Sequence, residues 1–252
     1  MLNIVIPIAG AGSRFVAKGF KIPKPLIPIN GMPMVHVVIK NIRPTCEHRF
    51  IFICQQTHID TYGLKEVLSE WAPKCKIIGL NGITDGAART VLSAEKWIDN
   101  TSPLMIANSD QFVDIDINLY INELNSKLLD GLIMTMKSND PKWSFVGKDP
   151  EGMVSRVVEK EVISDDATVG IYNFKHGSDF VKAAKRMISD NFRVNGEFYV
   201  APAFNQLIKS GAKIGSYDIS NEASGMHGLG TPADLELFLR HPASLKATGG
   251  IT

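Results

Sequence analysis

A glycine-bearing turn followed by two basic residues stands near the start of the chain. The apolar run Asn3–Ile8 has the pattern of a buried strand, and it stops at a loop of small residues, Ala9, Gly10, Ala11, Gly12 and Ser13. Because glycine lacks a Cβ, backbone amides in such a loop can approach an anion closely. Arg14 follows directly, and Lys24 comes later between two prolines that hold its segment extended. These residues predict a site for a triphosphate, with Arg14 and Lys24 supplying the positive charge.

The spacing excludes two better-known phosphate-binding loops. A Walker A loop needs Gly-Lys-Ser or Gly-Lys-Thr after the glycines, and neither follows here. A dinucleotide fingerprint needs a third Gly or Ala where this chain has Phe15. For the glycines taken alone, a purely structural turn remains the alternative.

An acid-bearing segment follows another strand-like run. Asn108, Ser109 and Asp110 come directly after the apolar run Pro103–Ala107. A carboxylate at the carboxyl end of a strand can hold Mg²⁺ against a triphosphate, so Asp110 is the predicted metal ligand. Asn-Ser-Asp is also ordinary turn chemistry, which is the structural alternative.

Small residues mark the start of a predicted helix after Thr84. Gly86 and Ala87 would let a flat base lie close to the backbone, and the amino terminus of a helix favours nearby negative charge. A packing face of small residues is the alternative interpretation.

The run Ala-Gly-x-Gly-Ser-Arg-Phe, followed by Pro-Lys-Pro-Leu-Ile-Pro, resembles the signature of the nucleotidylyltransferases that make activated sugars, cholines and related phosphate esters. The resemblance extends in order from Ile4 to about Phe238. It implies that Arg14 holds the β- and γ-phosphates, that Lys24 lies near the α-phosphate, and that Asp110 holds Mg²⁺. These three residues are the predicted catalytic set.

The base-binding segment departs from the family pattern. The related enzymes that act on sugars carry a glutamine shortly before the Gly-x-Ala stretch, and Asn81 or Thr84 takes its place here. The identity of the base therefore stays open at this point.

Residues of the second half resemble the family segments that line the pocket of the second substrate, namely Trp143, Lys160, Tyr172 and Glu197. The resemblance implies that Lys160 grips an acceptor phosphate, that Glu159 orients Lys160, and that Glu197 contacts acceptor hydroxyls. Without the resemblance, Lys160 belongs to a Glu-Lys-Glu run typical of a solvated face. Glu197 would equally suit a helix end, and Trp143 would equally suit the core.

The terminal family motif Asp-x-Gly-Thr-Pro has lost its aspartate, because Gly228 stands where a second metal ligand is expected. In this missing aspartate and in the segments Ala107–Gln111 and Lys142–Phe145, the chain resembles a short capsule-associated subgroup of the family. That subgroup includes a CTP:phosphoglutamine cytidylyltransferase. The resemblance implies transfer of NMP from an NTP, CTP in that subgroup, to a phosphorylated small-molecule acceptor with release of pyrophosphate.

Other functions remain open. A sugar-1-phosphate nucleotidylyltransferase could use UTP, dTTP or CTP. A glycosyltransferase would want an Asp-x-Asp metal pair, for which Asp114 and Asp116 have the form. A non-catalytic nucleotide-binding domain would bind NTP without turnover.

Composition limits the possible partners. The net charge of +1 over 252 residues argues against a general nucleic-acid binder. No apolar run approaches the length of a membrane span, and no signal peptide is visible. Cys46, Cys54 and Cys75 have no metal-like spacing, so we expect reduced thiols in a cytoplasmic protein. The oligomeric state is open.

The elements that must position these residues alternate between strand and helix. Up to about residue 140 this pattern predicts an α/β fold, with an open, twisted, mostly parallel Rossmann-like sheet and helices on both faces. Shorter strands from about Trp143 predict a small antiparallel extension. We therefore expect one domain over 1–252, with a nucleotide-binding part at 1–140 and an acceptor-binding part at 141–252. The loops that start at Ala9, Asn81 and Asn108 should converge at the carboxyl edge of the sheet.

Overall fold

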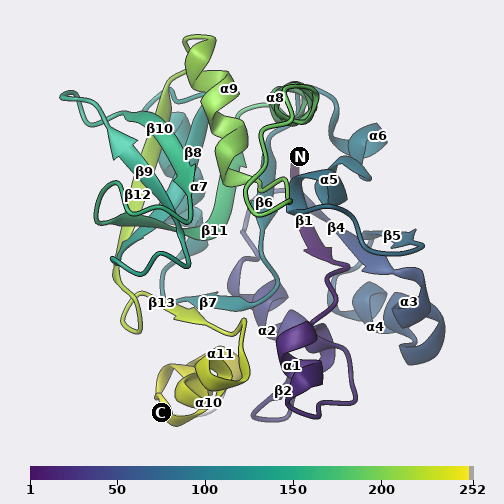
Figure 1. Ribbon diagram of the computed structural model, residues 1–252. Helices are drawn as coiled ribbons and strands as arrows, with labels where there is room; N and C mark the ends of the chain where they lie inside the picture. The colour runs from purple at the N-terminus through teal and green to yellow at the C-terminus, as the bar shows by residue number, and fades with distance from the viewer. Residues whose placement is uncertain (250–252) are drawn as a thin grey trace.

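The first half of the chain builds a parallel sheet. The computed structural model describes residues 1–249 (Figure 1). Its central strand β1 pairs in parallel with β4 on one side and β6 on the other, and β4 pairs in parallel with β5. The strands are β1 (Leu2–Ile8), β4 (His48–Gln55), β5 (Lys76–Leu80) and β6 (Leu104–Ala107). Parallel neighbours need crossover connections, and these contain the helices α2 (Met34–Asn41), α3 (Gln56–Tyr62), α4 (Leu64–Trp71), α5 (Ala87–Leu92) and α6 (Glu95–Ile98).

The second half extends this sheet with an antiparallel element. Strand β11 (Asp166–Phe174) runs antiparallel between β6 and β8 (Gly131–Lys137), and β12 (Ile214–Asn221) pairs in parallel with β8. The hairpin of β9 (Ser144–Lys148) and β10 (Val154–Glu159) continues the sheet beyond the first part of β11. The expected mostly parallel sheet with a small antiparallel extension is therefore confirmed.

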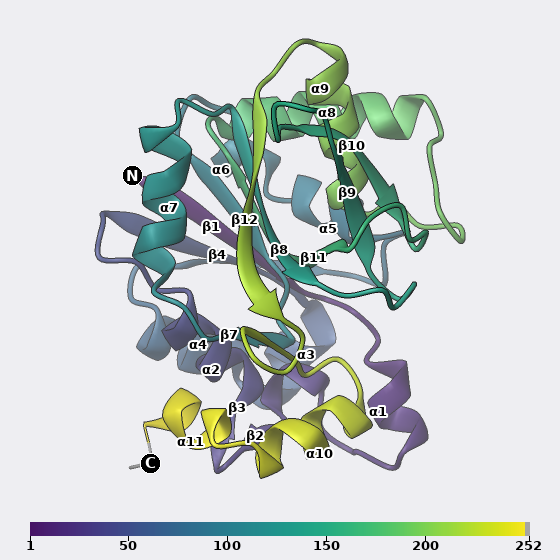
Figure 2. The same cartoon turned by 90° about the vertical axis from the view of Figure 1, so that its left-hand side faces the viewer.

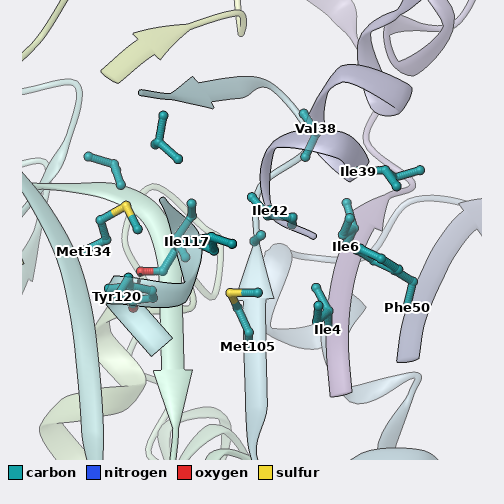
Figure 3. Packing of buried hydrophobic residues seen from close by; sticks show 14 of the residues in the cluster. Ile4, Ile6, Val38, Ile39, Ile42, Phe50, Met105, Ile117, Tyr120 and Met134 are labelled. Atoms are coloured by element: carbon teal, nitrogen blue, oxygen red, sulfur yellow. Dashed lines mark hydrogen bonds between the residues drawn. The ribbon is translucent and has the colours of Figure 1, made fainter. Parts of the chain in front are cut away.

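Helices cover both faces of the sheet (Figure 2). Along β1, Ile4 and Ile6 enter one buried cluster and Val5 enters the other, as the two-residue period of a strand requires. The first cluster packs against α2, α4 and α7 (Ile117–Ser126); Figure 3 shows Val38 and Tyr120 within it. The second packs against α5, α6, α8 (Gly177–Ser189) and α9 (Phe204–Lys209).

A third cluster joins the two ends of the chain. Phe15 of α1 (Ser13–Ala17) and Ile27 are buried with Phe238 of α10 (Pro232–Arg240) and Ala243 of α11 (Ala243–Thr248). The short elements beside it are η1 (Lys24–Leu26), β2 (Pro28–Ile29), β3 (Met32–Pro33), β7 (Gln111–Val113) and β13 (Met226–Gly228). The short helix η2 (Ala201–Ala203) packs in the second cluster instead. This packing fixes the segment of Lys24 beside the strand pair β7–β13.

Two helical stretches are divided in the structure. Gly63 adopts a left-handed φ of 60° and separates α3 from α4. Ser93 and Ala94 separate α5 from α6. Thr231 is the N-cap of α10, because its side chain accepts a hydrogen bond from the Asp234 amide.

The three cysteines are unpaired. Over the described part of the chain, no helix has both the length and the apolar character to cross a membrane.

Candidate active site

The small-residue loop lies between β1 and α1 and packs against the segment of Lys24. Gly12 has φ +61°, and a Cβ there would stand 3.3 Å from the Cβ of Lys24. The carbonyl of Ala9 accepts a hydrogen bond of 2.8 Å from Gln55 Nε2 at the end of β4. Glycine at position 12 therefore permits both the turn and the close approach of the lysine segment.

Lys24 and Asp110 meet at the carboxyl end of the sheet. The distance between Lys24 Nζ and Asp110 Oδ2 is 2.9 Å, and their side chains are 21% and 26% exposed. The Asp110 carbonyl also accepts a hydrogen bond of 2.8 Å from the Leu229 amide. An ion pair with this exposure adds little to stability, so its importance lies in bringing a cation and an acid to one point beside the glycine loop.

A cavity of about 440 Å³ opens over this ion pair. Its predicted lining residues are the loop Ala9–Ser13 with Lys24, Thr84, Gly86, Ala87, Asn108, Ser109 and Asp110. The loops after β1 and β6 thus converge as expected for strands that end at one edge. A separate hollow of about 590 Å³ along α8 and α9 holds none of the predicted site residues.

One wall of the first cavity is a backbone-to-backbone contact. The Phe198 amide donates to the Asp85 carbonyl at 2.8 Å, and the Ala88 amide donates to the Phe198 carbonyl at 3.0 Å. Gly86 lies between them with φ +119°, and a Cβ there would come within 2.4 Å of the Phe198 amide nitrogen. Glycine at 86 is thus required by the packing of this wall, whatever ligand the cavity takes.

Replacing Gly86 by alanine should reduce the free energy of unfolding by about 3 kcal/mol, because the new Cβ would push apart two hydrogen-bonded backbones. Urea denaturation checks this value. Gly82→Ala is the matched control, since Gly82 also has a positive φ but nothing lies within 4 Å of the added Cβ. It should lose only the roughly 1 kcal/mol of the left-handed backbone. Equal losses in the two variants would contradict the packing argument.

A second cavity of about 310 Å³ adjoins the first, and the two share Ala87, Asn108 and Glu197. All four residues predicted for the second substrate line it, namely Trp143, Lys160, Tyr172 and Glu197. A ligand in one cavity would therefore lie beside a ligand in the other.

The polar groups of the second cavity are paired in a specific pattern. Lys142 forms an ion pair of 2.8 Å with Glu222, and Trp143 Nε1 donates to the same carboxylate at 3.4 Å. The buried carboxylate of Glu159 accepts a hydrogen bond from the Ser144 hydroxyl. Burial raises the pKa of Glu159, and the hydrogen bond from Ser144 opposes that rise.

The partner of Lys160 differs from the one expected. Lys160 Nζ donates to the Tyr199 hydroxyl at 2.7 Å, whereas Glu159, the expected partner, is engaged by Ser144. This hydrogen bond raises the pKa of Lys160, which keeps the ammonium charged. Tyr172 is almost fully buried, and burial raises its pKa as well. Tyr172 therefore contributes a neutral wall rather than a charge.

Two predicted nucleotide contacts lie elsewhere. Arg14 lines the second cavity rather than the first, and Asn81 lines neither. In the loop that contains Asn81, it is Ile83 and Thr84 that line the first cavity. Lining residues that were not predicted include Ile83 and Thr90 in the first cavity and Lys142, Thr168 and Tyr199 in the second. Ile83, Lys142 and Tyr199 had a signal in the sequence: Ile83 adjoins Thr84, Lys142 opens the segment Lys142–Phe145, and Tyr199 lies two residues after Glu197.

Asp110 is the carboxylate that lies beside Lys24 and the glycine loop. Gly228 pairs with Gln111 in the β7–β13 ladder, directly beside Asp110, and brings no side chain. Within residues 1–249 no group of three or more His, Cys, Asp or Glu side chains could hold a metal ion. Mg²⁺ commonly takes one or two carboxylates with substrate phosphates and water. Asp110 at the cavity over the glycine loop therefore fits an Mg²⁺ ion whose other ligands come mainly from a bound phosphate and water.

The alternative Asp-x-Asp pair has other roles. Asp116 caps α7 by accepting from the Asn118 amide, and Asp114 forms an ion pair with Lys246. Neither lines the two adjoining cavities.

Comparison with known families decides the class of the protein. The model of the Nucleotidyl transferase family matches residues 4–214, which include both cavities' principal segments. The chain belongs to the nucleotidyl transferase family. Among curated relatives, the chain is similar to the bifunctional protein GlmU of Lactobacillus johnsonii, with 25% identity over 86% of the chain and 46% of that protein. GlmU of Acholeplasma laidlawii is 24% identical over 92% of the chain and 50% of that protein, so the chain spans about half the length of these relatives.

Solved structures align with the chain over nearly their whole length. The nucleoside-diphosphate-sugar pyrophosphorylase of Vibrio cholerae aligns with TM-score 0.77 and 26% identity, covering 94% of this chain and 99% of that one. A UDP-glucose pyrophosphorylase complexed with UDP-glucose aligns with TM-score 0.74 and 16% identity, covering 99% of each chain. The inositol-1-phosphate CTP transferase of T. maritima has TM-score 0.70 and 15% identity, covering 99% of this chain and 97% of that one. The last two likenesses concern the fold alone.

Proposed function

We propose that the protein transfers a nucleoside monophosphate from an NTP to a phosphorylated small-molecule acceptor and releases pyrophosphate. The observation that carries the proposal is the pair of adjoining cavities, one over the glycine loop with Lys24 and Asp110, the other lined by Arg14, Lys142 and Lys160. An oxygen of the acceptor phosphate would attack the α-phosphorus in line as the bond to the β-phosphate oxygen breaks. That oxygen is already anionic, so no strong general base is needed.

The first cavity would take the NTP. Backbone amides of 10–13 would cradle phosphate oxygens, and Lys24 would stabilise the charge that spreads at the α-phosphate. Asp110 would hold Mg²⁺. When bound, this ion would neutralise part of the negative charge of the phosphates. Arg14 is predicted to bind the β- and γ-phosphates of the NTP. Because Arg14 lines the second cavity, it would also be able to bind the phosphate of the acceptor.

The second cavity would take the acceptor, with Lys160 on its phosphate. Apart from Glu197, the first cavity is lined from residues up to 110, and most of the second from 142–201. This distribution supports a nucleotide-binding part at 1–140 and an acceptor-binding part at 141–252. We also propose a cytoplasmic location, where NTP is supplied.

For the substrates, we propose CTP as the nucleotide and phosphoglutamine as the acceptor, in the synthesis of a capsule or surface polysaccharide. The support is the resemblance to the capsule-associated subgroup, including Gly228 in place of the second aspartate. The second candidate is a sugar-1-phosphate nucleotidylyltransferase that uses UTP, dTTP or CTP. It is favoured by the similarity to the nucleoside-diphosphate-sugar pyrophosphorylase of Vibrio cholerae.

A grid of the four NTPs against sugar 1-phosphates, phosphocholine and phosphoglutamine, with pyrophosphate as the readout, tests the proposal. Pyrophosphate release with CTP and phosphoglutamine alone supports the first substrate pair, and release with a sugar 1-phosphate supports the second candidate. In a separate assay with nucleotide-sugars as donors, their consumption without release of pyrophosphate would indicate a glycosyltransferase. NTP binding without turnover for any acceptor would indicate a non-catalytic nucleotide-binding domain.

A further inference from the structure

Lys160 is held by a residue that lies 39 positions further along the chain. Its ammonium donates to the Tyr199 hydroxyl at 2.7 Å and lies 4.8 Å from the centroid of the same ring. Among the described residues, this hydroxyl is the only side-chain hydrogen-bond partner of Lys160. The hydroxyl takes one of the three N–H groups of the ammonium, so two remain to face the second cavity.

The backbone of Lys160 adopts a conformation that glycine would take more readily. Its φ is +58°, and its amide donates to the Trp143 carbonyl at 2.9 Å. A left-handed conformation in a residue with a Cβ costs about 1 kcal/mol and tends to occur at functional sites. Lysine in this position gives the second cavity an ammonium that a glycine would not supply.

The side chain of Lys160 is solvent-exposed, and an exposed lysine samples many rotamers. The neighbouring carboxylate of Glu159 does not restrain it, because Glu159 is buried and accepts from Ser144. The restraint comes from Tyr199, which also lines the second cavity and lies two residues after Glu197.

We propose that Tyr199 is the positioning residue of Lys160, holding its ammonium so that the two remaining N–H groups bind the phosphate of the acceptor. The inference rests on the proposed function and adds the residue that orients the acceptor site. The ring of Tyr199 restricts the position of the Lys160 ammonium through a cation–π contact. The hydroxyl of Tyr199 fixes the direction of one N–H group of that ammonium. The role assigned to Tyr199 is exerted through Lys160, and because Tyr199 does not line the NTP cavity, its loss should leave that cavity unchanged.

A titration with inorganic phosphate tests this role without any turnover. The 13Cε signal of Lys160 in 13C-lysine-labelled protein is assigned by its loss in Lys160→Met, and its shift is followed as phosphate is added. Tyr199→Phe keeps the ring and removes the hydroxyl, so phosphate should bind at Lys160 about tenfold more weakly. Tyr217→Phe is the matched control, because Tyr217 is half-buried on β12 and lines neither cavity. It should titrate like the wild type.

Steady-state kinetics with the best NTP and acceptor extend the test. Tyr199→Phe should raise KM for the acceptor about tenfold and leave KM for the NTP unchanged. In the double variant with Lys160→Met, removing the hydroxyl should add nothing to the loss seen in Lys160→Met alone. Rises in both KM values, or additive losses, would overturn the positioning role.

The two proposals fail in distinguishable ways. If Tyr199→Phe titrates with phosphate like the wild type, the positioning role is wrong even if the enzyme releases pyrophosphate. If phosphate binding weakens as expected but no substrate pair releases pyrophosphate, the proposed reaction is wrong and Tyr199 positions Lys160 for another phosphate ligand.

Discussion

Replacing Lys24 by alanine is expected to lower kcat by about 10²–10³-fold, measured as pyrophosphate release at saturating substrates. The ammonium lies 2.9 Å from Asp110 Oδ2 beside the glycine loop, where the most charged part of the transition state would lie. Removing a preorganised charge from such a position costs several kcal/mol of transition-state stabilisation. Wild-type turnover of purified Lys24→Ala with any NTP would show that this role is wrong.

The control for this variant is Lys21→Ala. Lys21 is an exposed lysine of the same loop and lines neither cavity, so its loss changes the local charge without touching the site. Both variants should have melting temperatures close to that of the wild type, because a partly exposed ion pair contributes at most about 1 kcal/mol to the free energy of unfolding. A large fall in melting temperature for Lys24→Ala alone would point to misfolding instead of a lost catalytic charge.

Replacing Asp110 by asparagine is expected to lower kcat by a similar factor of about 10²–10³. The substitution keeps the size of the side chain and removes the charge that is predicted to hold Mg²⁺. Because Gly228 brings no second carboxylate, no neighbour in the β7–β13 ladder can take over. The concentration of Mg²⁺ needed for half-maximal pyrophosphate release should therefore rise as well.

Asp114→Asn is the matched carboxylate control for this experiment. Asp114 lies four residues further on, pairs with Lys246 and lines neither of the adjoining cavities, so activity should persist. A glycosyltransferase that used the Asp-x-Asp pair would respond in the opposite way. Loss of activity in Asp114→Asn with retention in Asp110→Asn would reject the proposed site.

Local patterns in the sequence were sufficient for the class of fold and for much of the first cavity. Apolar runs such as Asn3–Ile8 and Pro103–Ala107 identify strands because burial on both faces demands continuous apolar residues. Turns that directly follow such strands must lie at one edge of a parallel sheet, which is why the glycine loop and Asp110 could be predicted to meet. The catalytic roles of Arg14, Lys24 and Asp110 stay predictions.

Contacts that depend on strand order and loop direction could not be predicted in this way. The insertion of β11 between β6 and β8 brings the segments around Trp143 and Lys160 beside the loops that follow β1 and β6. Arg14 turns toward the second cavity, and Asn81 lies outside both. Nothing in the spacing of the sequence distinguishes these outcomes, because each depends on the direction in which a side chain leaves its element.

The amino-acid sequence by itself determined which strands form, where the glycine turn falls, and that Lys24 and Asp110 could be predicted to meet beside it. The tertiary structure decided the pairing of Lys160 with Tyr199, the backbone contact that requires Gly86, and the junction of the two cavities. The physical reason is the separation along the chain of the residues that interact. Strand and turn preferences act between near neighbours in the chain, whereas these contacts join distant segments that only the packed sheet brings together.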